Sequence, residues 1–132
     1  MEKFYIDTPS QTMMINITSQ IREIIADKQF KDGICCVFIP HTTAALTINE
    51  SADPDVKSDI IMELNKVVPY RDNYRHMEGN SAAHIKASII GSSELIFVEN
   101  GNLQLGTWQG IFLCEFDGPR KRQVWIKLLV IN

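Results

Sequence analysis

The last third of the chain holds several strand-like stretches with no helical pattern between them, which limits the folds available. From residue 93 the sequence runs through "SELIFVEN", a "GNLQLG" turn region, "IFLCEF" and a long final strand in "RQVWIKLLVI". Helical patterns earlier in the chain interrupt other strands irregularly, so the βαβ units of a doubly wound sheet are missing. These features predict a single-domain α+β fold over residues 1–132. We expect a β-sandwich-like core of mixed or antiparallel sheets, with about three helices packed outside.

The first half of the chain alternates strand and helix patterns. "EKFYIDT" predicts a strand, and "TMMINIT" predicts its hairpin partner across the "PSQ" turn. Ile21, Ile24 and Ile25 lie at helical spacing and predict a helix from about Thr18 to Gln29. "ICCVFIP" and "AALTINE" then predict two strands joined around "HTT".

Two further helices carry clear start and stop signals. Asp53 is a good N-cap residue before Pro54, and Pro69 ends the pattern. The apolar face of this helix is predicted to contain Val56, Ile60, Ile61, Leu64 and Val67. The next helix is expected to begin at Asn80 or Ser81 and to end at Gly91. It is apolar around most of its circumference and is predicted to be buried, with a narrow polar stripe of His84, Lys86 and Ser88 and with His84 inside the protein.

Composition and charge exclude several classes of function. A net charge of −3 and the lack of a long basic stripe argue against binding to nucleic acid. The chain has no secretory signal pattern and no run of ~18 apolar residues, so we expect no association with a membrane and a cytoplasmic location. Cys35, Cys36 and Cys114 lie in apolar strands and are predicted to be small core residues in a reducing compartment.

All three histidines occur beside small or polar residues. His41 follows an apolar strand, His76 lies in the polar loop "YRHMEGN", and His84 lies on the third helix. Three imidazole ligands with an open position are the usual plan of a catalytic zinc site. Glu78, Glu115 or Asp117 could add a carboxylate. The spacing matches no sequential metal motif, so each histidine could equally be a structural residue.

A second polar segment, "NGNLQLGTWQGIFLCEFDGPRKR", contains glycines that permit close backbone approach. Trp108 offers a stacking surface and Gln109 an amide, although a turn with a core tryptophan explains both residues. Arg120 follows an Asp-Gly-Pro turn and could bind phosphate, whereas Lys121 and Arg122 are expected to be exposed. The chain has no Walker-type phosphate loop, no G-x-G-x-x-G and no G-x-S-x-G.

The motifs "HTTAALTINE", "DPDV", "YRH", "EGN", "AHIKASIIG" and "GTWQGIFLCEFDGPR" together resemble the YjbQ-like family, which is named as secondary thiamine-phosphate synthase. The resemblance covers the chain from its first strand to its last. It implies a small α+β sandwich that forms a homotrimer, with a pocket of histidines and acidic residues that holds a divalent metal, zinc or magnesium. It also implies that the pyrimidine diphosphate and the thiazole phosphate are joined and pyrophosphate is released.

The resemblance also assigns functional roles to residues of this sequence. It implies His41, His76 and His84 as metal ligands. It points to His41, Glu78, Glu115 and Arg120 as catalytic residues. It points to Thr42, Thr43, Asn49, Asn80, Trp108 and Gln109 as contacts of a small phosphorylated metabolite.

Three functional hypotheses follow. The first is a metal-dependent enzyme with thiamine-phosphate synthase activity. The second is a hydrolase that attacks a small metabolite with metal-bound water. The third is a non-catalytic trimeric metabolite-binding protein whose histidines stabilise the subunit interface.

Overall fold

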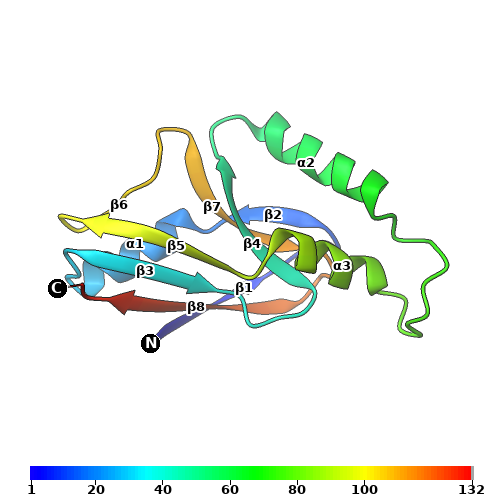
Figure 1. Cartoon of the computed structure of the whole chain (residues 1–132), viewed down its shortest axis with the longest axis horizontal. Helices are drawn as coiled ribbons and strands as arrows, with labels where there is room; N and C mark the ends of the chain where they lie inside the picture. Colours follow the sequence, from blue (N-terminus) through cyan, green and yellow to red (C-terminus); the bar gives the residue numbers. More distant parts are fainter. Residues whose placement is uncertain (132) are drawn as a thin grey trace.

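The computed structural model describes residues 1–131 and contains three helices and eight strands (Figure 1). Their order is β1 (Glu2–Asp7), β2 (Met13–Asn16), α1 (Thr18–Asp27), β3 (Gly33–Phe38), β4 (Ala44–Glu50), α2 (Pro54–Val67), α3 (Ser81–Ile90), β5 (Ser93–Glu99), β6 (Asn102–Leu103), β7 (Gln109–Glu115) and β8 (Lys121–Leu129). No helix among the described residues is long and apolar enough to cross a membrane.

The strands form two sheets. The larger sheet has the order β1-β8-β3-β5-β6 and the smaller one β2-β7-β4. Each strand pair in both sheets is antiparallel. The predicted α+β fold with a sandwich-like core is therefore confirmed, and the sheets are antiparallel rather than mixed.

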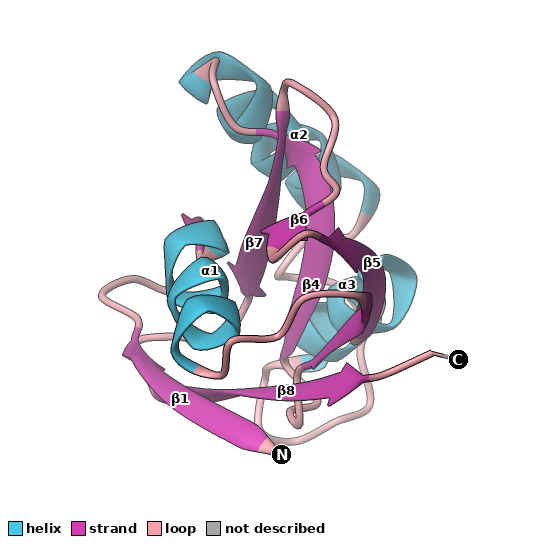
Figure 2. Ribbon diagram, turned by 90° about the vertical axis from the view of Figure 1, so that its left-hand side faces the viewer, coloured by secondary structure: helices cyan, strands magenta, loops and turns pink. Residues whose placement is uncertain are grey.

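Two hydrophobic clusters hold the layers together. The larger cluster lies between the two sheets and includes Val37, Leu46, Leu113 and Ile126, each at most 1% exposed. Helix α1 contributes Ile21 to this cluster. The second cluster covers the opposite face of the small sheet, where α3 packs closely and α2 lies further out (Figure 2). The small sheet is thus buried on both faces.

The predicted hairpin between the first two strands does not form. Strand β1 pairs with β8 in the large sheet, whereas β2 pairs with β7 in the small one. The connecting segment passes from one sheet to the other and is held by hydrogen bonds to the β7–β8 connection, from Thr8 N to Arg120 O and from Gly118 N to Gln11 O. A crossing of this kind lets β1 and β2 bury their apolar residues against the common core from opposite sides.

The later helices begin and end where the sequence predicts, although the Asn80 side chain makes no capping hydrogen bond at the start of α3. The Asp53 side chain accepts a hydrogen bond from Asp55 N at 2.9 Å, and Pro54 begins α2. Gly91 ends α3 with a φ of 100°, a conformation that favours glycine. The expected starts and ends of both helices are therefore confirmed.

The buried face of α3 differs from the prediction. Lys86, assigned to the polar stripe, is fully buried, whereas Ile85 and Ile89 are exposed. The Lys86 ammonium lies 3.7 Å from the centre of the Tyr70 ring and donates to Asn65 Oδ1. A cation–π contact and an amide acceptor thus replace the water that the charge loses. Burial lowers the pKa of Lys86.

The cysteines behave as small core residues in two of three positions. Cys35 and Cys114 are buried, and burial raises the pKa of each thiol to about 12. Cys36 is half-buried because neighbouring residues of a strand point to opposite faces. All three are free thiols.

The outer face of the large sheet carries exposed apolar side chains around one charged residue, Lys127, which pairs with Cys36. The strand register places Phe97 beside Ile34, Leu95 beside Cys36, and Phe38 beside Trp125. Leu95 and Phe97 are 64% and 66% exposed. We call this surface, formed by Ile34, Cys36, Phe38, Leu95, Phe97, Trp125 and Leu129, the outer sheet face.

The layered core predicts unequal costs for two leucine truncations. Leu113→Ala removes a side chain that is fully buried between the sheets, and we expect it to lower the free energy of unfolding by about 2–5 kcal/mol. Leu64→Ala on α2, a helix with no buried residue, is expected to cost less than half as much. Urea denaturation of both variants measures the difference. Equal losses would show that α2 is packed as tightly as the sheet core.

Candidate functional site

A polar cavity of about 580 Å³ opens where β3, β4, α3 and the β7–β8 connection meet. The residues that line it are Phe38, Ile39, Pro40, His41, Thr42, Thr43, Glu78, Asn80, His84, Ser92, Asp117, Arg120 and Arg122. Seven of these were predicted as site residues, namely His41, Thr42, Thr43, Glu78, Asn80, His84 and Arg120. The structure thus gathers most of the predicted residues in one cavity.

The wall of this cavity rests on a buried ion pair between the two sheets. Arg122 of β8 donates through Nε to Glu115 Oε1 of β7 at 2.8 Å, and its Nη2 donates to Glu115 Oε2. The same Nη2 reaches Thr43 Oγ1 at 2.8 Å. Thr8 Oγ1 and Asp117 N complete the carboxylate's hydrogen bonds. Because both carboxylate oxygens accept hydrogen bonds and the side chain is fully buried, Glu115 holds the cavity wall in this arrangement, and its predicted catalytic role stays a prediction.

The balance of forces on Glu115 favours its ionised form. Burial alone raises the pKa of this carboxyl, but the hydrogen bonds from Arg122, Thr8 and Asp117 N and the charge of Arg122 outweigh it. The net result is a pKa below the ordinary value. At neutral pH the pair is therefore charged on both sides.

His41 is held at the start of the "HTT" turn by the neighbouring strand. The backbone N–H of Gln123 donates to His41 Nε2 at 2.9 Å. Burial lowers the pKa of His41, the positive charges of Arg122 and Arg120 lower it further, and Glu115 opposes them. The imidazole is consequently neutral at pH 7.

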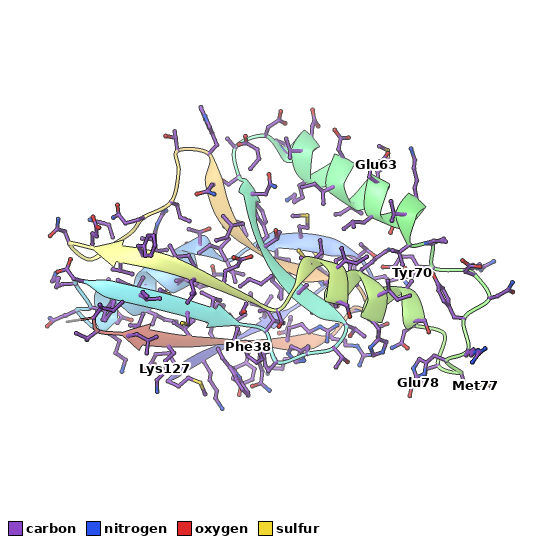
Figure 3. The ribbon with its side chains drawn as sticks, in the orientation of Figure 1. Phe38, Glu63, Tyr70, Met77, Glu78 and Lys127 are labelled. Atoms are coloured by element: carbon purple, nitrogen blue, oxygen red, sulfur yellow. The ribbon has the colours of Figure 1, made fainter. Side chains whose placement is uncertain are left out.

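The loop between α2 and α3 carries His76 and places one carboxylate, that of Glu78, in the opposite wall of the cavity. Figure 3 shows Met77 and Glu78 at the outer end of this loop. Glu78 Oε2 lies 3.7 Å from His76 Nε2. The rings of His76 and His84 meet edge to face with their centres 5.5 Å apart, beside a neighbouring cavity that both line. His84 thus lies between the main cavity and this second one.

The three histidines do not fit a shared metal centre as they are arranged. Among residues 1–131 no group of three or more His, Cys, Asp or Glu side chains is placed to hold a metal ion. His76 does not line the main cavity, and the Nε2 of His41 already accepts a hydrogen bond. The carboxylates of Glu78 and Asp117 both face that cavity and are ligands of the kind that magnesium prefers. Metal binding remains a prediction.

The "DGPR" turn offers the most accessible cation in the cavity. Arg120 Nη2 lies 2.9 Å from Asp117 Oδ2, and Arg120 Nε donates to the Asp117 carbonyl at 2.8 Å. Asn80 Nδ2 donates to the same carboxylate oxygen at 2.9 Å. The Arg120 side chain is 53% exposed, so part of the guanidinium remains open to a ligand. This geometry supports the prediction that Arg120 binds phosphate.

Three predicted substrate contacts lie elsewhere. Trp108 and Gln109 stand at the start of β7, and Asn49 pairs with Gly110 near the end of β4. Glu115 lies beside the cavity wall at the other end of the seven-residue β7, about 20 Å from Gln109 at the usual rise of a strand. Gln109 Oε1 instead accepts from Gly106 N at 2.7 Å and closes the turn. These residues therefore lie outside the cavity.

Sequence reasoning missed the role of Arg122, which was assigned to an exposed turn but is only 3% exposed. The sequence did contain a pattern that indicates burial of Arg122. The alternation in "RQVWI" places Arg122 on the same face of β8 as Val124 and Ile126, both of which point into the core. Ser92, next to the end of α3, gave no signal of its own.

Fold and cavity together define a small antiparallel α+β sandwich with a charged pocket at one end. A family model described as "UPF0047 protein YjbQ-like" matches residues 2–130, so the chain belongs to this family. The UPF0047 protein of Methanocaldococcus jannaschii is 48% identical over 127 residues, which cover 96% of this chain and 92% of that protein. The UPF0047 protein YugU of Bacillus subtilis is 48% identical, covering 94% of this chain and 95% of its own length.

Solved structures agree with this assignment. A protein of the YjbQ/UPF0047 family from Clostridium acetobutylicum is 50% identical and superimposes with a TM-score of 0.95, over 98% of this chain and 100% of that one. A conserved hypothetical protein from Thermus thermophilus is 41% identical, with a TM-score of 0.91 and coverage of 98% and 100%. The family resemblance read from the motifs is confirmed.

The buried pair predicts how stability depends on pH. Because the folded pKa of Glu115 is lowered, its ionised form stabilises the fold at pH values above the ordinary carboxyl pKa of 4.5. This contribution is lost as the pH falls from there through the lowered value. We expect Glu115→Gln to reduce the free energy of unfolding at pH 7 by about 3 kcal/mol and to flatten its fall in acid.

Urea denaturation at several pH values measures both effects. The double variant Glu115→Leu with Arg122→Met is a matched control, because it removes both charges and should cost less than Glu115→Gln. A single variant with wild-type stability at pH 7 would contradict this account of the pair.

Proposed function

We propose that this protein is an enzyme that acts on a small phosphorylated metabolite bound in the cavity beside His41. The observation that carries the proposal is the meeting of Arg120, the hydroxyl of Thr42 and the neutral imidazole of His41 in a cavity of about 580 Å³. That volume is typical of a site for a small molecule. The side chains supply directed hydrogen-bond donors for phosphate oxygens.

The charges around the cavity also constrain the ligand. Arg122 is neutralised by Glu115, and Arg120 is partly neutralised by Asp117. Glu78 adds a further carboxylate. A ligand is therefore held by directed hydrogen bonds rather than by a net positive field. A molecule that carries amine or hydroxyl donors as well as phosphate would satisfy the carboxylates and the guanidinium together.

The first reaction to test is the one that the family resemblance implies. Thiamine-phosphate synthesis joins a pyrimidine diphosphate to a thiazole phosphate and releases pyrophosphate. The amino-pyrimidine offers donors to Glu78 or Asp117, and the diphosphate offers oxygens to Arg120. Glu78 and Asp117 are also the residues that would hold a magnesium ion, which neutralises charge on a diphosphate when bound.

The two alternative functions require different substrates. A hydrolase of a small metabolite needs one substrate and water, whereas the synthase needs both precursors. A metabolite-binding protein would hold the ligand without turnover. Product analysis with each precursor alone and with both together separates these alternatives.

We also propose that copies of the chain associate as the homotrimer that the resemblance implies, through the outer sheet face. Leu95 and Phe97 leave a large apolar area open to solvent in one chain, and such patches usually mark contact surfaces. Phe38 belongs both to this surface and to the cavity lining, so the site lies next to the proposed interface.

Removal of the accessible cation tests the binding site. We expect Arg120→Gln to weaken pyrophosphate binding by about 10- to 100-fold, because hydrogen bonds to charged groups contribute about 1.5–3 kcal/mol. Isothermal titration calorimetry with pyrophosphate, with and without magnesium, measures the loss. Lys121→Gln is the matched control, since Lys121 is adjacent and exposed but does not line the cavity. Equal effects of the two changes would contradict the site.

A charge on the outer sheet face tests the assembly. We expect Phe97→Glu to dissociate the trimer, because it would bury a carboxylate at an apolar contact. Light scattering after gel filtration measures the mass of the particle. Val67→Glu changes an equally exposed apolar residue on α2 and should leave the trimer intact. The reverse result would place the interface on α2.

A further inference from the structure

The side chain of His41 is anchored through only one of its ring nitrogens. Strand β3 pairs with β8 as far as Phe38 opposite Trp125 and then turns away from the sheet. Gln123, two residues from Trp125, lies beyond this pairing, and its N–H donates to His41 Nε2 at 2.9 Å. The imidazole therefore replaces the carbonyl that β3 would have supplied.

This hydrogen bond determines where the proton of the neutral ring lies. A backbone N–H can only donate, so Nε2 must carry the free lone pair. The neutral imidazole then keeps its proton on Nδ1. Within residues 1–131 no side chain or carbonyl accepts from Nδ1. The ring nitrogen is not sealed inside the protein either, because the one buried side-chain polar atom without a partner in that range is Asn80 Oδ1.

We propose that His41 is fixed as the Nδ1–H tautomer and presents this N–H to the cavity, where it donates to an anionic oxygen of the ligand and does not ligate a metal. The anionic ligand rests on the function proposed above, whereas the tautomer does not. Coordination of a metal through Nδ1 would require that nitrogen to lose its proton while Nε2 still accepts from Gln123. The ring would then be an imidazolate, which costs far more than a neutral ligand.

The neighbours of His41 agree with a donor role. Arg122 and Thr43 form the wall beside it, and Arg120 and Thr42 face the same cavity. An Nδ1–H at this position adds a neutral donor to a guanidinium and a hydroxyl. Together they form a set of donors suited to the oxygens of a phosphate or a diphosphate.

The tautomer can be measured directly on the ligand-free wild-type protein. Two-bond and three-bond ¹H–¹⁵N correlation spectra of the histidine-labelled chain at pH 7 distinguish the two neutral forms, and the spectrum of His41→Asn assigns the signals. We expect a protonated Nδ1 and an unprotonated Nε2. A protonated Nε2 overturns the proposal, as does a shift of both His41 nitrogens to metal-bound values when zinc alone is added.

Two substitutions test the donor in the binding site. His41→Asn places an amide N–H₂ near the position of Nδ1, whereas His41→Gln places it near that of Nε2. We expect His41→Asn to bind pyrophosphate within about threefold of wild type and His41→Gln to bind it at least about tenfold more weakly. The opposite order overturns the proposal. If wild type fails to bind pyrophosphate, the proposed function fails on this probe while the tautomer spectrum still decides the state of His41.

Discussion

The ion pair between Glu115 and Arg122 is the interaction on which the candidate site depends. Glu115 belongs to the small sheet and Arg122 to the large one, so the pair joins the two layers at the end of the sandwich where the core gives way to the cavity. Burial of two charges is costly, and the cost is offset only when every lone pair finds a donor. Thr8 Oγ1 and the backbone N–H of Asp117 donate to Glu115, and Thr43 Oγ1 accepts from the Arg122 guanidinium.

The same hydrogen bonds position the groups that face the ligand. Thr43 is held next to Thr42 and His41, and Asp117 is held at the start of the turn that carries Arg120. Arg120 N also donates to Thr8 Oγ1 at 2.9 Å, so the turn is attached at both ends. A rigid cavity wall of this kind spares a ligand the cost of ordering its contacts on binding.

Local sequence signals predicted the parts of the fold that depend on neighbouring residues. The caps of α2 and α3 could be read because a side-chain acceptor, a proline and a glycine act within one turn of the chain. The pairing of β1 could not be read from local signals, because its partner β8 lies more than a hundred residues away in the sequence. The buried Lys86 was misjudged for the same reason, since Tyr70 and Asn65, which accommodate it, are distant in sequence.

The sequence predicted part of the site. Whether a predicted histidine lies in the main cavity depends on the element that carries it. His41 in the β3–β4 connection and His84 on α3 both line the main cavity, whereas His76 lies in the exposed loop between α2 and α3 and lines the neighbouring cavity. A centre of three histidines therefore needs two separate changes, a movement of this loop and release of His41 Nε2 from Gln123. The first is inexpensive, because segments with few buried contacts open at low free energy. The second breaks a hydrogen bond that satisfies a strand N–H, so the anchored ring, rather than the loop, opposes metal binding and favours His41 as a donor.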